Sequence, residues 1–200
     1  MVDFAQSRSA LERVYIQGRF GTANEQPGVT LTERRHLTMV HVEHRDNDAE
    51  SPLAIAAAVG FPLPRAGQTA EKDGRRVIWL GPSRSLITAS GASADGLADA
   101  IAGKAENAAV NDISSSRVVI RISGPNARDA LAAGCPLDLH RDAFKPGMTA
   151  TTNVDHYTAI VDCIDTDTFD VYVARGYGVS FWQWLIEATE EFGGEVLAAN

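Results

Sequence analysis

The sequence predicts an α+β fold built from two halves that share one order of elements. Short β-rich runs and short Ala-rich helices follow the order strand–helix–strand–strand–helix–strand over residues 36–113. The same order, without its final strand, returns over residues 118–192. Gly60-Phe61-Pro62-Leu63 and Gly134-Cys135-Pro136-Leu137 echo each other, each directly after a helix. Because this is the order of a split βαβ, ferredoxin-like unit, we expect two such halves fused into one single domain over residues 31–200.

The first thirty residues, 1–30, carry a different pattern. Arg8 to Ile16 predicts a weak helix, and residues 17–29 are rich in glycine and polar residues typical of a loop. A segment of this length without regular structure is unusual in a compact domain. We therefore expect an extended N-terminal arm that is either disordered or laid across a partner, with Phe4, Tyr15 and Phe20 as contact residues.

The first half opens with an alternating strand from His36 to Glu43, and a helix follows with Ser51 as its cap. Residues 53–59 of that helix are apolar on all sides, which predicts burial on more than one face, in the core or against another chain. Gly60 ends the helix. The remaining expected elements are strands over residues 76–80 and 85–90 joined by a hairpin loop, a helix over 93–104 and a strand over 108–113.

The second half begins with a strand from Val118 to Ile122. Ser123 is expected to cap the next helix, and Gly134 to adopt the left-handed conformation after it. Strands over residues 157–164 and 169–174 form a hairpin, and a last helix starts near Ser180. On that helix, Trp182 and Ile186 point about 100° away from the core face, so we expect a second cover and an interface there.

Composition narrows the class of protein. The net charge of −8 argues against a nucleic-acid partner or an anionic membrane surface, since both require a basic face. The sequence contains no run of 18 consecutive apolar residues, so it predicts no membrane span. The N-terminus carries no apolar signal region, and we therefore expect a cytoplasmic protein. In that compartment Cys135 and Cys163 are expected to be free, buried thiols.

Several groups that could form a site lack the required spacing. His36 and His41 fall on opposite faces of the expected strand, as do His41 and His44, so they predict no metal site. The acidic run Asp162, Asp165, Asp167 and Asp170 lacks the glycine and glutamate of a calcium loop and is interpreted as a solvated hairpin turn. Gly176-Tyr177-Gly178 lacks the third glycine of a dinucleotide site.

The run Ile122 to His140, ISGPNARDALAAGCPLDLH, continues with Ala143-Phe144 and Pro146-Gly147. It resembles the gamma subunit of heterotetrameric sarcosine oxidase, and the resemblance extends to residues 79–90 and 181–185. That family is related to the folate-binding aminomethyltransferase of the glycine cleavage system. The resemblance therefore implies a fold similar to the folate-binding domain of that enzyme.

The resemblance also implies a function for the assembly. The complex would contain alpha, beta and delta subunits and would oxidise sarcosine with O2 to glycine, H2O2 and 5,10-methylenetetrahydrofolate. FAD, covalently held FMN, NAD, tetrahydrofolate and zinc would belong to the other subunits. The gamma subunit would be architectural, with no catalytic, cofactor-binding or metal-binding residue of its own.

Asp162 supports an alternative hypothesis. The resemblance places Asp162 where the aminomethyltransferase family has a carboxylate that assists the reaction at the folate nitrogen. That family tends to carry two adjacent acids there, whereas Cys163 stands in the second position here. A thiol does not replace a carboxylate as a charge or as an acceptor. The alternatives are a stand-alone folate-binding protein that uses Asp162, or the same subunit of another N-methyl amino-acid oxidase complex.

Overall fold

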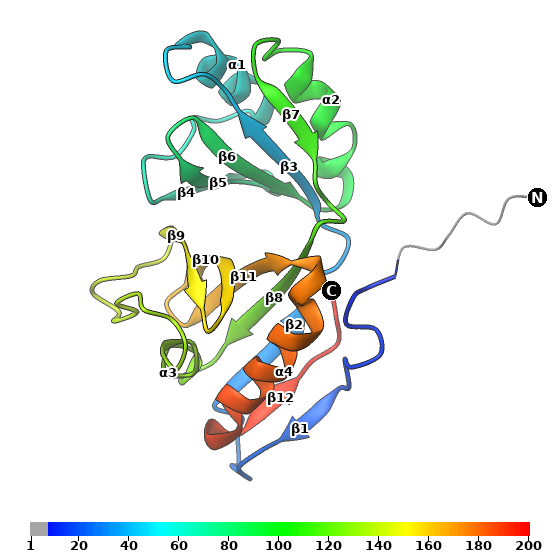
Figure 1. Cartoon of the computed structure of the whole chain (residues 1–200), viewed down its shortest axis with the longest axis vertical. Helices are drawn as coiled ribbons and strands as arrows, with labels where there is room; N and C mark the ends of the chain where they lie inside the picture. The colour runs from blue at the N-terminus through cyan, green and yellow to red at the C-terminus, as the bar shows by residue number, and fades with distance from the viewer. Residues whose placement is uncertain (1–7) are drawn as a thin grey trace, which may run out of the picture.

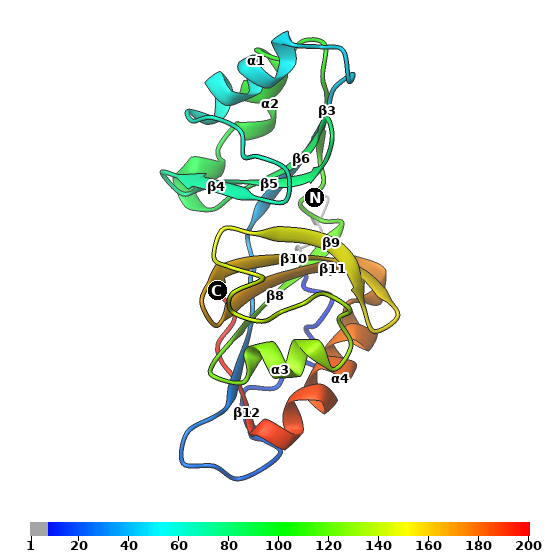
Figure 2. The same cartoon turned by 90° about the vertical axis from the view of Figure 1, so that its left-hand side faces the viewer.

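The computed structural model describes residues 8–200, which form four layers along the long axis of the molecule (Figures 1 and 2). Two helices cover the outer face of a five-stranded sheet, and two others cover the outer face of a seven-stranded sheet. The inner faces of the two sheets pack against each other. In the described part of the chain, no helix is long and apolar enough to cross a membrane.

The first half builds the five-stranded sheet, in the order β4-β5-β6-β3-β7. Apart from the short extra strand β4, its elements follow the predicted ferredoxin-like order. Its elements are β3 (Thr38–Glu43), α1 (Glu50–Val59), β4 (Thr69–Lys72), β5 (Arg75–Gly81), β6 (Arg84–Ala89), the 3-10 turn η1 (Gly91–Ala94), α2 (Leu97–Ala102) and β7 (Ala109–Asp112).

The second half builds the seven-stranded sheet, in the order β1-β12-β2-β8-β11-β10-β9. Its own elements are β8 (Arg117–Ser123), α3 (Ala127–Ala132), β9 (Thr149–Val154), β10 (Tyr157–Asp165), β11 (Thr168–Ala174), η2 (Arg175–Tyr177), α4 (Gly178–Thr189), η3 (Glu190–Phe192) and β12 (Gly194–Val196). The final strand that the sequence pattern lacked is β2 (Val29–Glu33), which comes from the N-terminal segment and pairs antiparallel with β8.

The alternation of residues along each strand decides what the layers contain. On β8, Ile120 and Ile122 face α3 and α4, whereas Val119 faces the other sheet. On β5, Val77 faces its own helices and Ile78 faces the seven-stranded sheet. Each half therefore has its own apolar core, and a third apolar cluster joins the two sheets.

The described part of the N-terminal arm packs on the second half. Leu11 is fully buried in that core, and β1 (Gly18–Phe20) pairs with β12 at the edge of the sheet. The helix predicted over Arg8–Ile16 is wrong, because these residues form only a turn closed by bonds to the carbonyl oxygen of Leu11. The division into an arm and one domain stays a prediction.

Three further predictions about where helices begin or end are wrong. Asp48, not Ser51, caps α1, because its carboxylate accepts the backbone N–H groups of Glu50 and Ser51. The helix predicted over 93–104 is split, since Gly96 adopts a left-handed conformation before α2. Ser123 lies inside β8 and does not cap α3.

The two predicted helix-ending glycines differ. Gly60 follows α1 in the left-handed conformation, as predicted. Gly134 does not have a positive φ, so its predicted left-handed conformation is wrong. A Cβ at Gly134 would lie 2.5 Å from the ring of Trp184, so this glycine is required for close packing against α4.

Candidate functional site: the charged seam between the two sheets

The facing surfaces of the two sheets, which we call the seam, contain an apolar patch beside several charges. The patch joins three residues of the first half, Met39, Ile78 and Leu86, to three of the second, Val119, Ile160 and Tyr172. The charges occupy the same strand faces, because residues two apart on a strand point the same way. Arg76 thus lies on the face of Ile78, and Asp162 on the face of Ile160.

Asp162 and Arg76 form a buried ion pair across the seam. The two carboxylate oxygens of Asp162 lie 2.6 Å from Nε and 2.7 Å from Nη2 of Arg76. Asp162 is fully buried, and Arg76 also bonds to Glu71 and Thr69 on β4. Because both oxygens of Asp162 are already held by one guanidinium group, neither is presented to a ligand.

Burial and pairing act on this carboxyl in opposite directions. Burial is the larger effect and raises the pKa of Asp162 to about 6, although the hydrogen bonds and charge of Arg76 lower it. The same pairing raises the pKa of Arg76. The ion pair therefore only partly offsets the removal of Asp162 from water, which is common for buried pairs.

A second charged group lies beside this pair. Asp170 accepts two hydrogen bonds from Arg121, at 2.7 and 2.8 Å, and a longer one from Arg34 at 3.3 Å. These side chains line a cavity of about 240 Å³ in the seam, together with Arg76 and Tyr172. Every described acid in the wall of this cavity is paired with an arginine. The seam therefore joins the two halves and offers no free carboxylate.

The four acids of the acidic run therefore do not form one solvated hairpin turn, and the interpretation made from the sequence is wrong. Asp162 and Asp170 point into the seam, and Asp165 lies at the exposed end of the hairpin. Asp167 is partly exposed and pairs with Arg141 at 2.9 Å. The sequence contained a signal that distinguishes these acids. Asp162 and Asp170 lie within apolar runs of strand length, which favours buried positions, whereas Asp165 and Asp167 lie in the turn between the strands.

Cys163 points to the opposite side of β10 from Asp162 and is fully buried. Burial raises the pKa of its thiol to about 11, so the group is neutral near pH 7. Arg128 lies beside it and donates to the carbonyl oxygens of Thr166, Leu139 and Phe144. Arg128 therefore ties the carbonyl oxygens of three loop residues together beside Cys163. Both cysteines are free and buried, as predicted.

The remaining candidates do not gather into a site. Among residues 8–200, no three His, Cys, Asp or Glu side chains are arranged to hold a metal ion. His36 precedes β3 with a left-handed backbone, so the strand argument did not apply to it. Gly176 and Tyr177 belong to the turn η2, and Gly178 begins α4 against Val118.

The predicted contact residues lie mostly against the chain itself. The Trp182 ring is 3% exposed and packs on Tyr15, with ring centroids 5.0 Å apart. Phe20 and Ile186 are half-buried against the second core, and Phe4 lies outside the described residues. The second cover expected over α4 exists, but it is the N-terminal segment of this chain. A contact of these residues with another subunit stays a prediction.

Comparisons with known sequences agree with this architecture. Residues 70–199 match the family described as GCVT N-terminal domain. A sarcosine oxidase subunit gamma from an Arthrobacter species is 33% identical over 174 residues, which cover 85% of this chain and 84% of the relative. A subunit gamma from Corynebacterium sp. (strain P-1) is 32% identical over 148 residues, or 72% of each chain.

Two solved structures resemble the fold. A chain of the heterotetrameric sarcosine oxidase from Corynebacterium sp. U-96, in complex with pyrrole 2-carboxylate, superposes with a TM-score of 0.84 and 26% identity over 93% of this chain and 96% of that one. The glycine cleavage system aminomethyltransferase T from Bartonella henselae gives a TM-score of 0.63 at 18% identity, over 87% of this chain and 48% of that one. The predicted α+β fold related to the folate-binding domain is confirmed.

Proposed function

This chain belongs to the family of sarcosine oxidase gamma subunits, and from that premise we propose that it is the architectural subunit of a four-subunit oxidase. The curated relatives are matched over 72% and 84% of their own length, and the solved chain over 96% of its length. The assembly would convert sarcosine and O2 to glycine and H2O2, and would pass the one-carbon unit to tetrahydrofolate.

The burial of Asp162 and its pairing with Arg76 are the main support for a non-catalytic role. An acid that assists chemistry needs an oxygen within hydrogen-bond reach of its substrate. Asp162 has no exposed surface, and Arg76 takes both of its oxygens. On the resemblance to the family, we propose that FAD, FMN, NAD, tetrahydrofolate and zinc belong to the alpha, beta and delta subunits. The free thiols Cys135 and Cys163 fit a reducing compartment such as the cytoplasm.

An uncovered helix face supports a role in assembly. Residues 53–59 of α1 are all apolar, yet only Ile55, Ala58 and Val59 are buried. Leu53 is 73% exposed on the outer side of the first half. A helix this apolar is usually covered on more than one side. We propose that a partner subunit covers the face of α1 that contains Leu53, while the seam keeps residues 31–200 together as one domain.

Co-expression with the three partner genes tests both parts. The double variant Arg76→Met/Asp162→Leu is expected to assemble and to retain sarcosine-dependent H2O2 formation within about twofold. An assembled complex that loses more than a hundredfold in activity would contradict the architectural role. Leu53→Asp is expected to reduce the recovered complex. Its control is the unfolding temperature of the isolated variant, which should not change because Leu53 is exposed.

A stand-alone folate-binding protein is the second candidate, favoured by the likeness of the fold to an aminomethyltransferase. Calorimetry of the isolated chain with tetrahydrofolate separates the two. Binding tighter than about 10 µM, roughly −7 kcal/mol, would favour this candidate over the architectural subunit. We expect no such binding, because the buried acid is already paired.

A further inference from the structure

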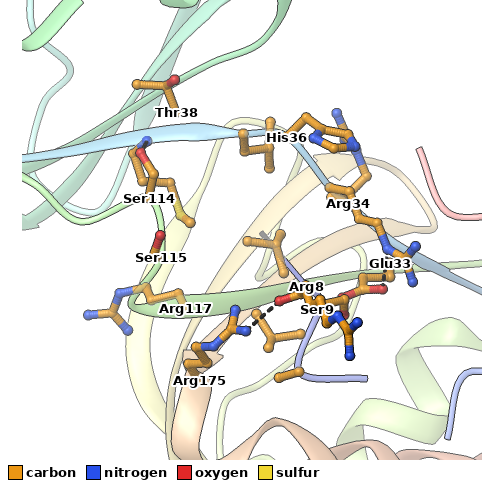
Figure 3. Close-up of a pocket in the computed structure, with 16 residues that line it drawn as sticks. Arg8, Ser9, Glu33, Arg34, His36, Thr38, Ser114, Ser115, Arg117 and Arg175 are labelled. Carbon is orange, nitrogen blue, oxygen red and sulfur yellow. Dashed lines mark hydrogen bonds and ion pairs between the residues drawn. The ribbon is translucent and has the colours of Figure 1, made fainter. Parts of the chain in front are cut away.

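Two cavities touch the connection between β2 and β3, and Arg34 and Leu37 line both of them. The cavity of about 290 Å³ in Figure 3 contains several arginines, but its Arg117 and Arg34 side chains lie on opposite sides and Arg117 points away. Its charges therefore do not converge on one ligand. The other cavity, of about 240 Å³, lies between the two sheets, and we call it the seam cavity.

Strands of both halves supply the wall of the seam cavity. Arg76 and Thr88 come from β5 and β6 of the first half, whereas Arg121, Asp170 and Tyr172 come from β8 and β11 of the second. Each of these residues belongs to the apolar cluster that joins the sheets or lies two positions from one of its members, so all of them point into the seam. A ligand in this cavity would therefore touch both halves at once.

The hydroxyl group of Tyr172 is a buried donor without a partner. The side chain is 1% exposed, and its hydroxyl makes no hydrogen bond to residues 8–200. The fully enclosed side-chain atoms without a partner in this range belong to Arg34, Arg117 and Asp167, so the Tyr172 hydroxyl keeps a small accessible surface, which opens on the seam cavity. Burial raises the pKa of Tyr172 well above its ordinary value, so the hydroxyl is neutral and can donate.

Two further donors lie in the same wall. Thr88 is 5% exposed, and its hydroxyl has no hydrogen-bond partner within the described chain. Arg121 binds Asp170 through Nε and Nη2, which leaves Nη1 without a described partner. Native proteins rarely leave buried polar groups unpaired, and each such group calls for an explanation. One hydroxyl from each half and one guanidinium nitrogen thus lack an acceptor in a single cavity.

The groups around Asp170 leave one positive charge in excess. Asp170 accepts two hydrogen bonds from Arg121 and a longer one from Arg34 at 3.3 Å, so two arginines share one carboxylate. At the other end of the cavity Arg76 pairs with two acids, which confines the excess positive charge to the end near Asp170. Because the acids of the wall are already paired, the missing acceptor has to come from a ligand.

The size and the apolar part of the wall limit what that ligand can be. Leu37, Ala89 and Ile164 add apolar surface to the cavity. Its volume of about 240 Å³ is below the range of about 300–1,000 Å³ that is usual for drug-sized ligands. The cavity therefore favours a charged acceptor with a few carbon atoms over a molecule as large as tetrahydrofolate.

We propose that the seam cavity binds a small carboxylate through Tyr172, Thr88 and Arg121. The carboxylate oxygens would accept hydrogen bonds from the two hydroxyl groups and from Nη1 of the guanidinium group, and charge-assisted bonds of this kind are the strong ones. Because the donors come from both halves, an occupied site would stabilise the packing of the two sheets. The site lies within one chain and needs no partner subunit, so its failure would leave the proposed function standing.

Calorimetric titration of the full chain with acetate, at constant ionic strength set by chloride, tests the site. We expect one saturable site, and Tyr172→Phe should raise its Kd about tenfold, because a hydrogen bond to a charged group is lost. Tyr177→Phe is the matched control, since it makes the same change at an exposed tyrosine outside the cavity, and its Kd should not change. Absence of saturable binding, or equal weakening by the control, overturns the proposal.

A neutral analogue tests the charge of the ligand. Acetamide has nearly the same shape as acetate but carries no charge, so it should bind about tenfold more weakly or not at all. Binding of acetamide as tight as that of acetate overturns the assignment of a carboxylate.

Thr88→Val tests the contribution of the first half. Valine replaces the hydroxyl with a methyl group of similar size, so the cavity keeps its shape and loses one donor. This variant should also bind acetate more weakly than the natural chain. Unchanged binding would mean that the ligand contacts the second half alone, which overturns the proposed site between the halves.

Thermal unfolding separates binding from structural support. Without acetate, Tyr172→Phe should unfold at the same temperature as the natural chain or higher, because the hydroxyl that it removes has no partner among residues 8–200. Added acetate should raise the unfolding temperature of the natural chain more than that of the variant. If Tyr172→Phe unfolds at a lower temperature without acetate, the hydroxyl already stabilises the fold and the proposal fails.

Discussion

The two halves contain the same Gly-x-Pro-Leu sequence after their first helix, but the two glycines are needed for different reasons. Gly60 has a φ of +95°, and a Cβ added there would meet nothing within 4 Å. Gly134 has an ordinary φ, and a Cβ there would lie 2.5 Å from Trp184 and 2.9 Å from the Asp155 nitrogen. One helix thus ends at an open surface, whereas the other ends against α4. A shared motif does not establish a shared physical cause.

The halves also complete their sheets differently. The first half supplies its own fourth strand, β7, next to β3. The second half takes β2 from the N-terminal segment, and β2 in turn carries β12 and β1 to the edge of the sheet. The described part of the arm is therefore a structural part of the second half. This difference makes the second half sensitive to changes far away in the sequence.

The largest expected effect tests that sensitivity. Trp182→Ala should lower the unfolding free energy by about 3–5 kcal/mol, because it empties the space between α4 and Tyr15. Leu53→Ala on α1 of the first half should change it by no more than about 0.5 kcal/mol, since that side chain is exposed. Urea unfolding of both variants provides the measurement. Equal effects would show that the arm does not pack on α4 as described.

The next effect concerns the pair that joins the halves. Asp162→Ala should cost about 3 kcal/mol in urea unfolding at pH 7, because it leaves the mostly buried charge of Arg76 with the exposed Glu71 as its only acidic partner. The double variant Arg76→Met/Asp162→Leu should lie within about 1 kcal/mol of the natural chain, since apolar residues of similar size can replace a buried pair. A double variant as unstable as the single one would mean that the halves require charges in the seam.

A smaller, pH-dependent effect follows from the same carboxyl. The pKa of Asp162 is about 6 in the folded chain and near 4 when unfolded, so the folded protein holds this proton more tightly. The contribution of Asp162 to stability is then present below about pH 4 and is lost as pH rises to about 6, by on the order of 2 kcal/mol. Asp162→Asn cannot titrate and serves as the reference.

Urea unfolding of the natural chain and of Asp162→Asn at pH 4, 5, 6 and 7 measures this difference. The natural chain should lose stability relative to the variant across this interval. The opposite trend would show that the attraction of Arg76 outweighs burial and that the pKa of Asp162 is lowered.

The fold could be predicted from the sequence where the period of apolar residues was clear. The strands near residues 76–80, 85–90 and 169–174 were found because β-branched residues alternate or cluster there. The short strand β12 and the Thr-rich β9 carry little apolar pattern, and their pairing depends on neighbours distant in sequence. Likewise, Arg76 and Asp162 meet across two sheets, 86 positions apart, and no local pattern predicts that contact.

The smallest single expected effect, at Gly60, belongs to a comparison that separates the two glycines directly. Gly60→Ala should cost about 1 kcal/mol, because alanine tolerates the left-handed conformation poorly, and Gly60→Asn should cost less, because asparagine adopts it more readily. At Gly134 the order should reverse: alanine costs about 1–3 kcal/mol through contact with Trp184, and the larger asparagine costs more. Thermal unfolding of the four variants gives the ranking. If asparagine were better than alanine at both positions, Gly134 would also be a conformational requirement, and the two halves would end their helices in the same way.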